Sequence, residues 1–306
     1  MQYRQLGNSG LTVSVVGLGA NNFGGRLDQQ QTTAVVSAAI DAGINHIDTA
    51  EVYGGGGGSE RMIGEALKGK RDKVVLATKF GHQGRAPDNA PGSRRNVRRA
   101  IEDSLRRLQT DYIDLYYLHF PDAVTPVAET LAAMTELIAE GKVRYIAECN
   151  FPAWQVVEAE WTARAEHTAR FIACQHHYSL LHRAPEAELL PACQRYGIGF
   201  VPYFPLAQGL LTGKYRRGEA APAGTRLADR PAALTDEVFD RLAAIQAYAD
   251  ERGLSLLQVA IGGIAAQPGV ASVIAGATKP EQIAANVAAA EWIPSAEDLA
   301  ALNALR

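Results

Sequence analysis

Short runs of apolar residues alternate with longer amphipathic segments along almost the whole chain. Each run has about the length of a buried parallel strand, which is hydrophobic on both faces. The runs are Val13–Leu18, Ile44–Ala50, Val74–Phe80, Tyr112–His119, Val143–Asn150, Phe171–His176, Gly199–Phe204 and Val270–Gly276. The segments between them with helical spacing include Thr32–Ala42, Ser59–Leu67, Arg94–Leu108, Pro126–Glu140, Ala153–His167, Glu186–Tyr196 and Ser255–Ala266.

Eight strand–helix units without a break in composition predict an α/β protein, a single (β/α)8 TIM barrel over residues 1–306. An open doubly wound sheet is the alternative, and the regular spacing favours the closed barrel. Tyr3–Leu6 and Leu11–Val13 flank a Gly-Asn-Ser-Gly turn, which predicts an N-terminal β-hairpin. Asp236–Glu251 and Ser295–Leu305 are expected to form two accessory helices.

One connection, Phe204–Thr235, is much longer than the others and rich in Gly, Pro, Ala and Arg. Connections longer than about 12–15 residues are usually functional or disordered. This segment is therefore a candidate loop that covers a ligand.

Composition narrows the class of protein. With 47% hydrophobic residues and a formal net charge of −3, the chain is neither disordered nor a typical binder of nucleic acid. Its three cysteines form no C-x-x-C pair, which favours a reducing compartment. The first residues lack the pattern of a secretory signal, and no run approaches the ~20 apolar residues of a membrane helix. We expect a soluble cytoplasmic protein without membrane contact.

Four titratable residues stand where strands of the expected barrel end, at the face that carries the active site in this fold. They are Asp48, Tyr53, Lys79 and His119. A tyrosine has an ordinary pKa near 10, and a neighbouring ammonium group lowers it. Tyr53 beside Lys79 is thus expected to donate a proton, within a surround that stabilises an oxyanion. This chemistry suits reduction of a carbonyl group.

Sequence motifs extend this interpretation over the chain. They are GLG (17–19), DTAEVYG (48–54), SE..IG.AL (59–67), TKFG (78–81), D.Y.LH.PD (114–122), PLAQGLLTGKY (205–215) and GATKPEQIAAN (276–286). With these motifs in this order, the chain resembles the aldo-keto reductases over essentially its full length. The resemblance implies Tyr53 as general acid, tuned by Lys79 and Asp48, with His119 orienting the carbonyl. It also implies a nicotinamide cofactor that delivers hydride from C4.

The resemblance also implies the residues that hold this cofactor, which is expected to be NADP(H). Asn150 and Gln175 would bind the carboxamide, and Tyr203 would stack on the nicotinamide. The expected diphosphate ligands are Phe204, Pro205, Leu206, Lys214 and Arg226. The expected ligands of the adenosine 2′-phosphate are Gly276, Thr278, Lys279, Gln282 and Asn286, together with the N-terminus of a helix beginning near Pro280.

Three positions depart from the commoner family pattern. Cys149 replaces a serine, which weakens one hydrogen bond to the carboxamide. Phe204 also replaces a common serine, so only its backbone can contact phosphate. Gln282 stands where some branches carry arginine, which bears on recognition of the 2′-phosphate.

Aromatic residues near the expected barrel mouth are candidates for the substrate pocket: Phe23, Phe120 and Trp154. The partner is expected to be a small carbonyl compound, and the protein a monomer or weak oligomer. Gly17-Leu18-Gly19 is not a dinucleotide fingerprint, because Asn22 stands where the third glycine would be.

Three other functions remain open. A cofactor-bound regulatory subunit, like the potassium-channel β subunits that resemble this family, would keep the same residues. A Schiff-base enzyme would use Lys79 as nucleophile. A metal hydrolase would combine His119 with His176 and His177, but neighbours on a strand face opposite sides and no zinc-like spacing surrounds them, so no metal is expected.

Overall fold

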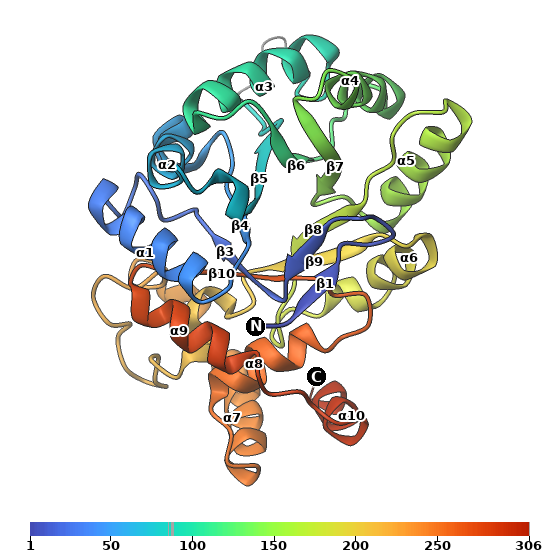
Figure 1. Ribbon diagram of the computed structural model, residues 1–306. Helices are drawn as coiled ribbons and strands as arrows, with labels where there is room; N and C mark the ends of the chain where they lie inside the picture. Colours follow the sequence, from blue (N-terminus) through green and yellow to red (C-terminus); the bar gives the residue numbers. More distant parts are fainter. Residues whose placement is uncertain (85, 87–88, 306) are drawn as a thin grey trace.

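The computed structural model describes residues 1–84, 86 and 89–305. Eight parallel strands form a closed barrel in the order β10-β3-β4-β5-β6-β7-β8-β9, and helices surround it (Figure 1). This confirms the predicted (β/α)8 fold over the open-sheet alternative. The strands are β3 (Val16–Gly19), β4 (His46–Asp48), β5 (Val75–Phe80), β6 (Ile113–Leu118), β7 (Val143–Cys149), β8 (Ala173–His177), β9 (Gly199–Tyr203) and β10 (Val273–Gly276).

The helices follow the amphipathic segments closely. Those packed around the barrel are α1 (Gln29–Asp41), α2 (Tyr53–Ala66), α3 (Arg94–Leu108), α4 (Val127–Ala139), α5 (Ala153–Ala165), α6 (Leu189–Tyr196), α8 (Leu256–Ala265) and α9 (Pro280–Ala289). The two accessory helices are α7 (Asp236–Glu251) and α10 (Ala296–Ala304). Short 3₁₀ helices are η1 (Arg71–Lys73), η3 (Ala184–Glu186), η4 (Ala207–Thr212) and η5 (Pro231–Ala233).

Side-chain caps fix where several helices begin. Asp28 accepts from the backbone N–H of Gln31, whose side chain returns a hydrogen bond to the Asp28 N–H. Ser255 and Ser295 cap α8 and α10 in the same reciprocal way. Each of these residues satisfies backbone donors that a helix N-terminus leaves unpaired.

The hairpin forms as predicted from β1 (Tyr3–Gln5) and β2 (Thr12–Ser14). Leu6 and Val13 pack with the residues inside the barrel, so the hairpin closes the end at which the strands begin. Val13 therefore belongs to β2 and not to the first barrel strand, which begins at Val16. The apolar run at 13–18 could not reveal this division, because both strands bury their side chains.

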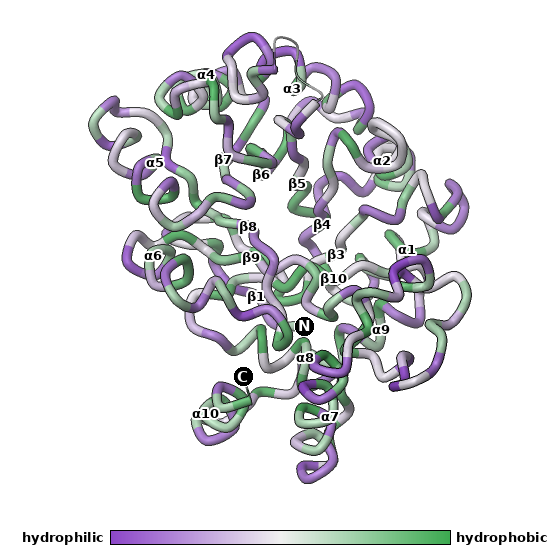
Figure 2. Tube along the Cα trace, turned by 180° about the vertical axis from the view of Figure 1, so that it is seen from behind, coloured by the Kyte–Doolittle hydropathy of each residue, from purple (hydrophilic) through white to green (hydrophobic). Residues whose placement is uncertain are grey.

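Two hydrophobic layers hold the barrel together. A small cluster fills its interior, and a larger one lies between the strands and the helices. In Figure 2 the outer helices alternate between hydrophobic and hydrophilic positions within each turn, as amphipathic helices do. Within the described ranges, no helix is both long enough and apolar enough to cross a membrane.

The start of α2 differs from the prediction, which placed it at Ser59. The helical segment begins at Tyr53, but Gly54 to Gly57 have φ between 65° and 92° and interrupt its first turn. Glycine adopts such left-handed conformations without a Cβ clash. The glycine run thus forms a sharp turn that places Tyr53 beside the mouth of the barrel.

Candidate active site

The carboxyl ends of the strands surround a cavity of about 690 Å³, a volume typical of ligand sites. Most of the residues expected to form the site line it, although they come from many separate segments. These lining residues are Asp48, Tyr53, His119, Phe120, Asn150, Gln175, Tyr203, Phe204, Pro205, Leu206, Lys214, Arg226, Gly276, Thr278, Gln282 and Asn286.

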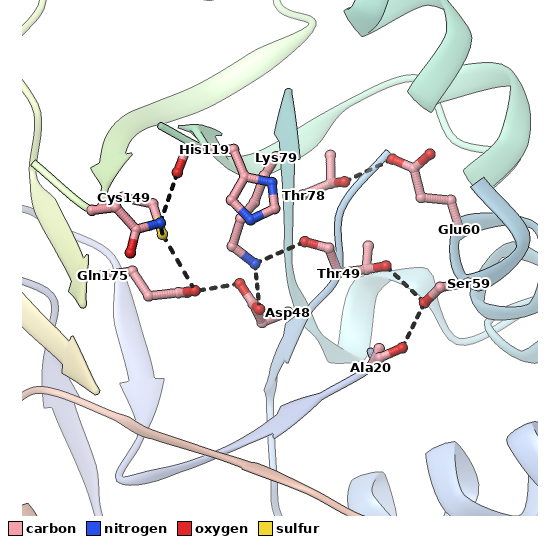
Figure 3. A network of polar contacts seen from close by, with 11 residues as sticks. Ala20, Asp48, Thr49, Ser59, Glu60, Thr78, Lys79, His119, Cys149 and Gln175 are labelled. Carbon is pink, nitrogen blue, oxygen red and sulfur yellow. Dashed lines mark hydrogen bonds and ion pairs between the residues drawn. The ribbon is translucent and has the colours of Figure 1, made fainter. Parts of the chain in front are cut away.

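Lys79 lies behind the cavity wall and forms an ion pair with Asp48. Its Nζ donates to Asp48 Oδ2 at 2.5 Å and to the backbone oxygen of Thr49 at 3.0 Å (Figure 3). Burial acts to lower the pKa of Lys79, but the Asp48 carboxylate and Tyr53 more than offset this and raise it above its ordinary value. Lys79 is therefore a permanent, fully buried cation.

Tyr53 lines the cavity next to this cation. Lys79 Nζ is 5.2 Å from the centroid of the Tyr53 ring. Burial raises the pKa of the phenol, and the charge of Lys79 opposes the rise. Lys79 therefore acts in the direction expected from the sequence, but burial outweighs it, and the net pKa of Tyr53 lies above its ordinary value. Lys79 limits the rise but does not reverse it.

His119 completes this group at the end of β6. Its ring meets the Tyr53 ring edge-on, with centroids 5.9 Å apart. Burial, followed by the charges of Lys79 and His82, lowers its pKa well below the ordinary value, so the imidazole is neutral at pH 7. Its Nδ1 is buried and forms no hydrogen bond within the described part of the chain.

A second layer of hydrogen bonds holds the segment that carries these groups. Thr49, whose backbone oxygen binds Lys79, has its hydroxyl 2.8 Å from Ser59 Oγ, and Ser59 donates to the Ala20 oxygen at 2.9 Å. Thr78 donates to the buried carboxylate of Glu60 (Figure 3). Thr49 follows Asp48 and Thr78 precedes Lys79 in the sequence, and each is hydrogen-bonded to a residue of α2.

The amide side chains expected at the nicotinamide are already hydrogen-bonded. Tyr203 Oη donates to Asn150 Oδ1 at 2.8 Å, and Asn150 Nδ2 donates to the His119 oxygen at 2.9 Å. Gln175 Nε2 donates to Asp48 Oδ1 at 2.9 Å. Cys149 Sγ lies 3.9 Å from Gln175 Oε1, a weak contact consistent with the weaker bond expected of a thiol.

Three cationic side chains line the cavity. Arg26, Lys214 and Arg226 all line it, and none forms an ion pair with another described residue. Arg226 donates instead to the side-chain oxygens of Asn21 and Asn22. Unpaired charges around one hollow are a suitable environment for a polyanion.

The backbone of the long connection adds to this environment. Phe204, Ala207, Gln208 and Gly209 have φ of 55°, 45°, 59° and 97°, in the left-handed region. Such turns can form concave anion-binding sites; here the N–H groups of Ala207 and Gly209 donate to the Phe204 and Leu206 oxygens and close the turn. A Cβ on Gly209 would lie 2.6 Å from Lys214 Nζ, so glycine allows that ammonium group to approach the loop. The donor set fits the diphosphate of a dinucleotide.

The end of the cavity next to α9 differs in detail from the expectation. Gln282 Oε1 accepts from the Thr278 N–H at 2.7 Å, so its Nε2 is the donor end left for a ligand. Lys279 is exposed and does not line the main cavity. It borders a shallower hollow that adjoins the cavity at Arg26 and Thr278.

Two aromatic residues expected in the substrate pocket lie elsewhere. Phe23 is fully buried in the hydrophobic core, since the chain turns inward after Ala20. Trp154 is 64% exposed on the first turn of α5 and does not line the cavity. Only Phe120 lines it, stacked on His119 with ring centroids 4.9 Å apart.

Several lining residues escaped the sequence analysis. Asn21, Asn22 and Arg26 follow the end of β3, and hydrogen bonds within residues 20–27 fold this loop back over the cavity. The position of Asn21 and Asn22 directly after a strand was the available signal. His82, which follows β5, was also missed and packs edge-on against both His119 and Phe120.

The paired histidines do not form a metal site with His119. Among residues 1–84, 86 and 89–305, no group of three or more His, Cys, Asp or Glu side chains is arranged to hold a metal ion. His177 stacks instead on His182 and Tyr203.

Comparisons with known proteins agree with this fold and site. A model of the aldo/keto reductase family matches residues 15–306. The chain is 39% identical to a probable voltage-gated potassium channel subunit beta of Oryza sativa subsp. japonica, over 96% of this chain and 92% of that protein. It is 38% identical to the uncharacterized oxidoreductase YrpG of Bacillus subtilis, over 99% and 95% of the two chains. It is 34% identical to protein tas of Escherichia coli, over 100% and 97%.

These matches define the class of protein as an oxidoreductase built on a (β/α)8 barrel. The chain belongs to the aldo/keto reductase family.

Proposed function

We propose that this protein reduces an aldehyde or ketone to the alcohol with NADPH, in a reversible reaction. The observation that carries the proposal is the buried Lys79–Asp48 pair behind Tyr53, in a cavity also lined by three cations that form no ion pair within the described part of the chain. A proton donor and a polyanion site in one hollow are what such a reductase needs.

The protein's own groups act on the carbonyl oxygen. Tyr53 Oη donates its proton to that oxygen as negative charge develops on it, and Lys79 stabilises the phenolate that remains. Asp48 fixes the Lys79 ammonium through the 2.5 Å contact. Neutral His119 donates a hydrogen bond to the same oxygen from Nε2, since its Nδ1 is buried and has no hydrogen-bond partner among the described residues.

The other half of the reaction depends on the cofactor, which supplies hydride from nicotinamide C4 when bound. Tyr203 would support the nicotinamide ring, and Asn150 and Gln175 would exchange part of their present hydrogen bonds for the carboxamide. Lys214, Arg226 and Arg26 would bind the diphosphate. Thr278, Lys279, Gln282 and Asn286, at the α9 end, would bind the 2′-phosphate and so distinguish NADPH from NADH.

Turnover of a carbonyl panel tests the proposal. Purified protein is mixed with NADPH and aldehydes, ketones and sugars, and absorbance at the reduced-nicotinamide band is followed. We expect cofactor oxidation that depends on the carbonyl and is lost in Tyr53→Phe. If no carbonyl is reduced, and no alcohol is oxidised with NADP⁺, the enzymatic proposal is wrong.

Similarity to probable potassium-channel β subunits supports a second candidate, a cofactor-bound regulatory subunit with slow turnover. The reductase and the regulatory subunit would share the same site residues and differ in the rate of turnover. Tight NADPH binding, with turnover too slow to separate from a Tyr53→Phe control, would favour the regulatory role. Multiple turnovers per second would favour the enzyme.

The Schiff-base alternative finds little support in the geometry. Lys79 is fully buried, hydrogen-bonded to Asp48 and Thr49, and held protonated by its surroundings. A nucleophilic amine must be neutral and must reach its substrate. Borohydride trapping with a carbonyl compound should therefore leave Lys79 unmodified.

A further inference from the structure

Tyr203 and Tyr53 are the only described tyrosines that line the cavity. The ring of Tyr203 also stacks on His177, which does not line the cavity. His177 and Tyr203 are directly opposite each other on the neighbouring strands β8 and β9. His177 is two residues beyond Gln175, so both side chains face the inside of the barrel. The rings of His177 and Tyr203 are nearly parallel, at 13°, with centroids 5.6 Å apart.

His182 supports His177 in turn. The two imidazole rings stack with centroids 4.0 Å apart and an angle of 5°. Backbone hydrogen bonds in both directions between Ser179 and His182 close the turn that carries His182. Arg241 of α7 donates to the backbone oxygens of Leu180 and Leu181 in the same turn. The outer ring is thus held by the backbone of a braced turn.

The protonation states of His177 and His182 permit their rings to stack. Burial lowers the pKa of His177 to about 4, and His182 and His176 contribute in the same direction. Burial and then Arg241 lower the pKa of His182 as well. Both imidazoles are therefore neutral at pH 7, and no charge repulsion separates rings 4.0 Å apart.

We propose that His177, backed by His182, is a positioning residue that holds the Tyr203 ring as a rigid platform for the nicotinamide end of the cofactor. The Tyr203 hydroxyl is fixed by Asn150, and its ring by His177 and by the edge of Phe204. Because the hydroxyl and the ring of Tyr203 are both restrained, the side chain loses little conformational freedom when a second ring stacks on it. The inference rests on the proposed function, because it concerns the same cofactor site.

Two ligands that occupy opposite ends of the cavity make the test specific. Reduced nicotinamide mononucleotide probes the Tyr203 end, and adenosine 2′,5′-bisphosphate probes the α9 end. Their dissociation constants, and that of NADPH, are measured by fluorescence titration on wild type, His177→Ala and His177→Phe. His176→Ala is the matched control, since His176 is the neighbour on the opposite face of β8.

We expect His177→Ala to bind the mononucleotide and NADPH roughly three- to tenfold more weakly, the size of an aromatic pair interaction. His177→Phe keeps a flat ring and should stay within about twofold of wild type, as should His176→Ala. Binding of the bisphosphate should not change in any variant. In turnover, KM for NADPH should rise in His177→Ala while KM for the carbonyl stays constant.

Other results would overturn the inference. Equal binding of the mononucleotide by His177→Ala and wild type would show that the platform does not depend on His177. Equal weakening of both probes, or failure of His177→Phe to restore binding, would indicate a general structural role. If wild type binds NADPH but the variants do not differ, only this inference fails. If wild type binds neither probe nor NADPH, the proposed function fails with it.

Discussion

Lys79 Nζ lies 2.5 Å from Asp48 Oδ2 inside the barrel, and the two side chains are 0% and 4% exposed. A buried ion pair is costly to desolvate, and it is weak evidence for stability alone. Its position behind the Tyr53 ring gives it a chemical purpose, since it keeps a cation next to a phenol that burial would otherwise make a poorer proton donor.

This relationship predicts how pH affects the rate of carbonyl reduction. In Lys79→Met the phenol loses the charge that limits the rise of its pKa, so turnover should fall by about 10²-fold or more and its basic limb should move to higher pH. The Asp48 carboxylate raises the pKa of Tyr53, so Asp48→Asn should move the basic limb of the pH profile to lower pH.

The pH profiles of kcat for these two variants are the measurement. Breaking a buried ion pair costs about 3–5 kcal/mol of stability, so thermal melting and NADPH binding are recorded beside them. Profiles of Lys79→Met and wild type that coincide after scaling would contradict a tuning role for Lys79.

A buried carboxyl group outside the site predicts a stability change with pH. Burial raises the pKa of Glu148, on β7, to about 8, and the group is fully buried with Oε1 unpaired among the described residues. The folded state therefore keeps a proton that the unfolded state loses above its ordinary pKa of 4.5. By linkage, Glu148 lowers stability progressively as pH rises from about 4.5 to about 8, by on the order of 5 kcal/mol in total.

Glu148→Gln removes this titration while keeping the shape of the side chain. The free energy of unfolding of the variant minus that of wild type should increase between pH 5 and pH 8 and then level off. Denaturant unfolding at several pH values gives this difference curve, in which the other titrating groups cancel. A flat curve would mean that Glu148 is not held protonated in the native protein.

The cations around the cavity predict the choice of cofactor. NADPH should bind roughly 10- to 100-fold more tightly than NADH, since charge-assisted hydrogen bonds contribute about 1.5–3 kcal/mol each and the site is partly exposed. Arg226→Gln, at the expected diphosphate site, should weaken the binding of both cofactors alike, whereas Lys279→Gln, among the residues at the α9 end, should narrow the difference between NADPH and NADH. Higher salt should narrow it too, because part of the attraction is screened. Equal dissociation constants for the two cofactors in fluorescence titration would show that these residues do not read the 2′-phosphate.

The sequence was most informative where burial dictates residue type. Strands buried on both sides must be apolar, so their ends, and with them Asp48, Lys79 and His119, could be located without a structure. Side-chain direction was harder to predict. Trp154 stands five residues after Cys149, the last residue of β7, yet the first turn of α5 directs it to solvent.

Contacts between distant segments could not be predicted either. Arg26 reaches the cavity because residues 20–27 fold back on themselves, and the stack of His182 on His177 depends on a turn braced by α7. The net pKa shift of Tyr53 could not be predicted from the sequence for the same reason. Sequence gives the neighbouring cation, but only the packed structure gives the burial that outweighs it.

The proposed reaction depends on Tyr53 as proton donor, a role that the Tyr53→Phe variant removes. The variant keeps the ring and removes the proton, so NADPH binding by fluorescence titration should stay within about twofold of wild type, while kcat for carbonyl reduction falls by ~10²–10⁴-fold. We expect retained binding with severely reduced turnover. A Tyr53→Phe protein that binds NADPH and reduces carbonyls within about twofold of the wild-type rate would contradict it.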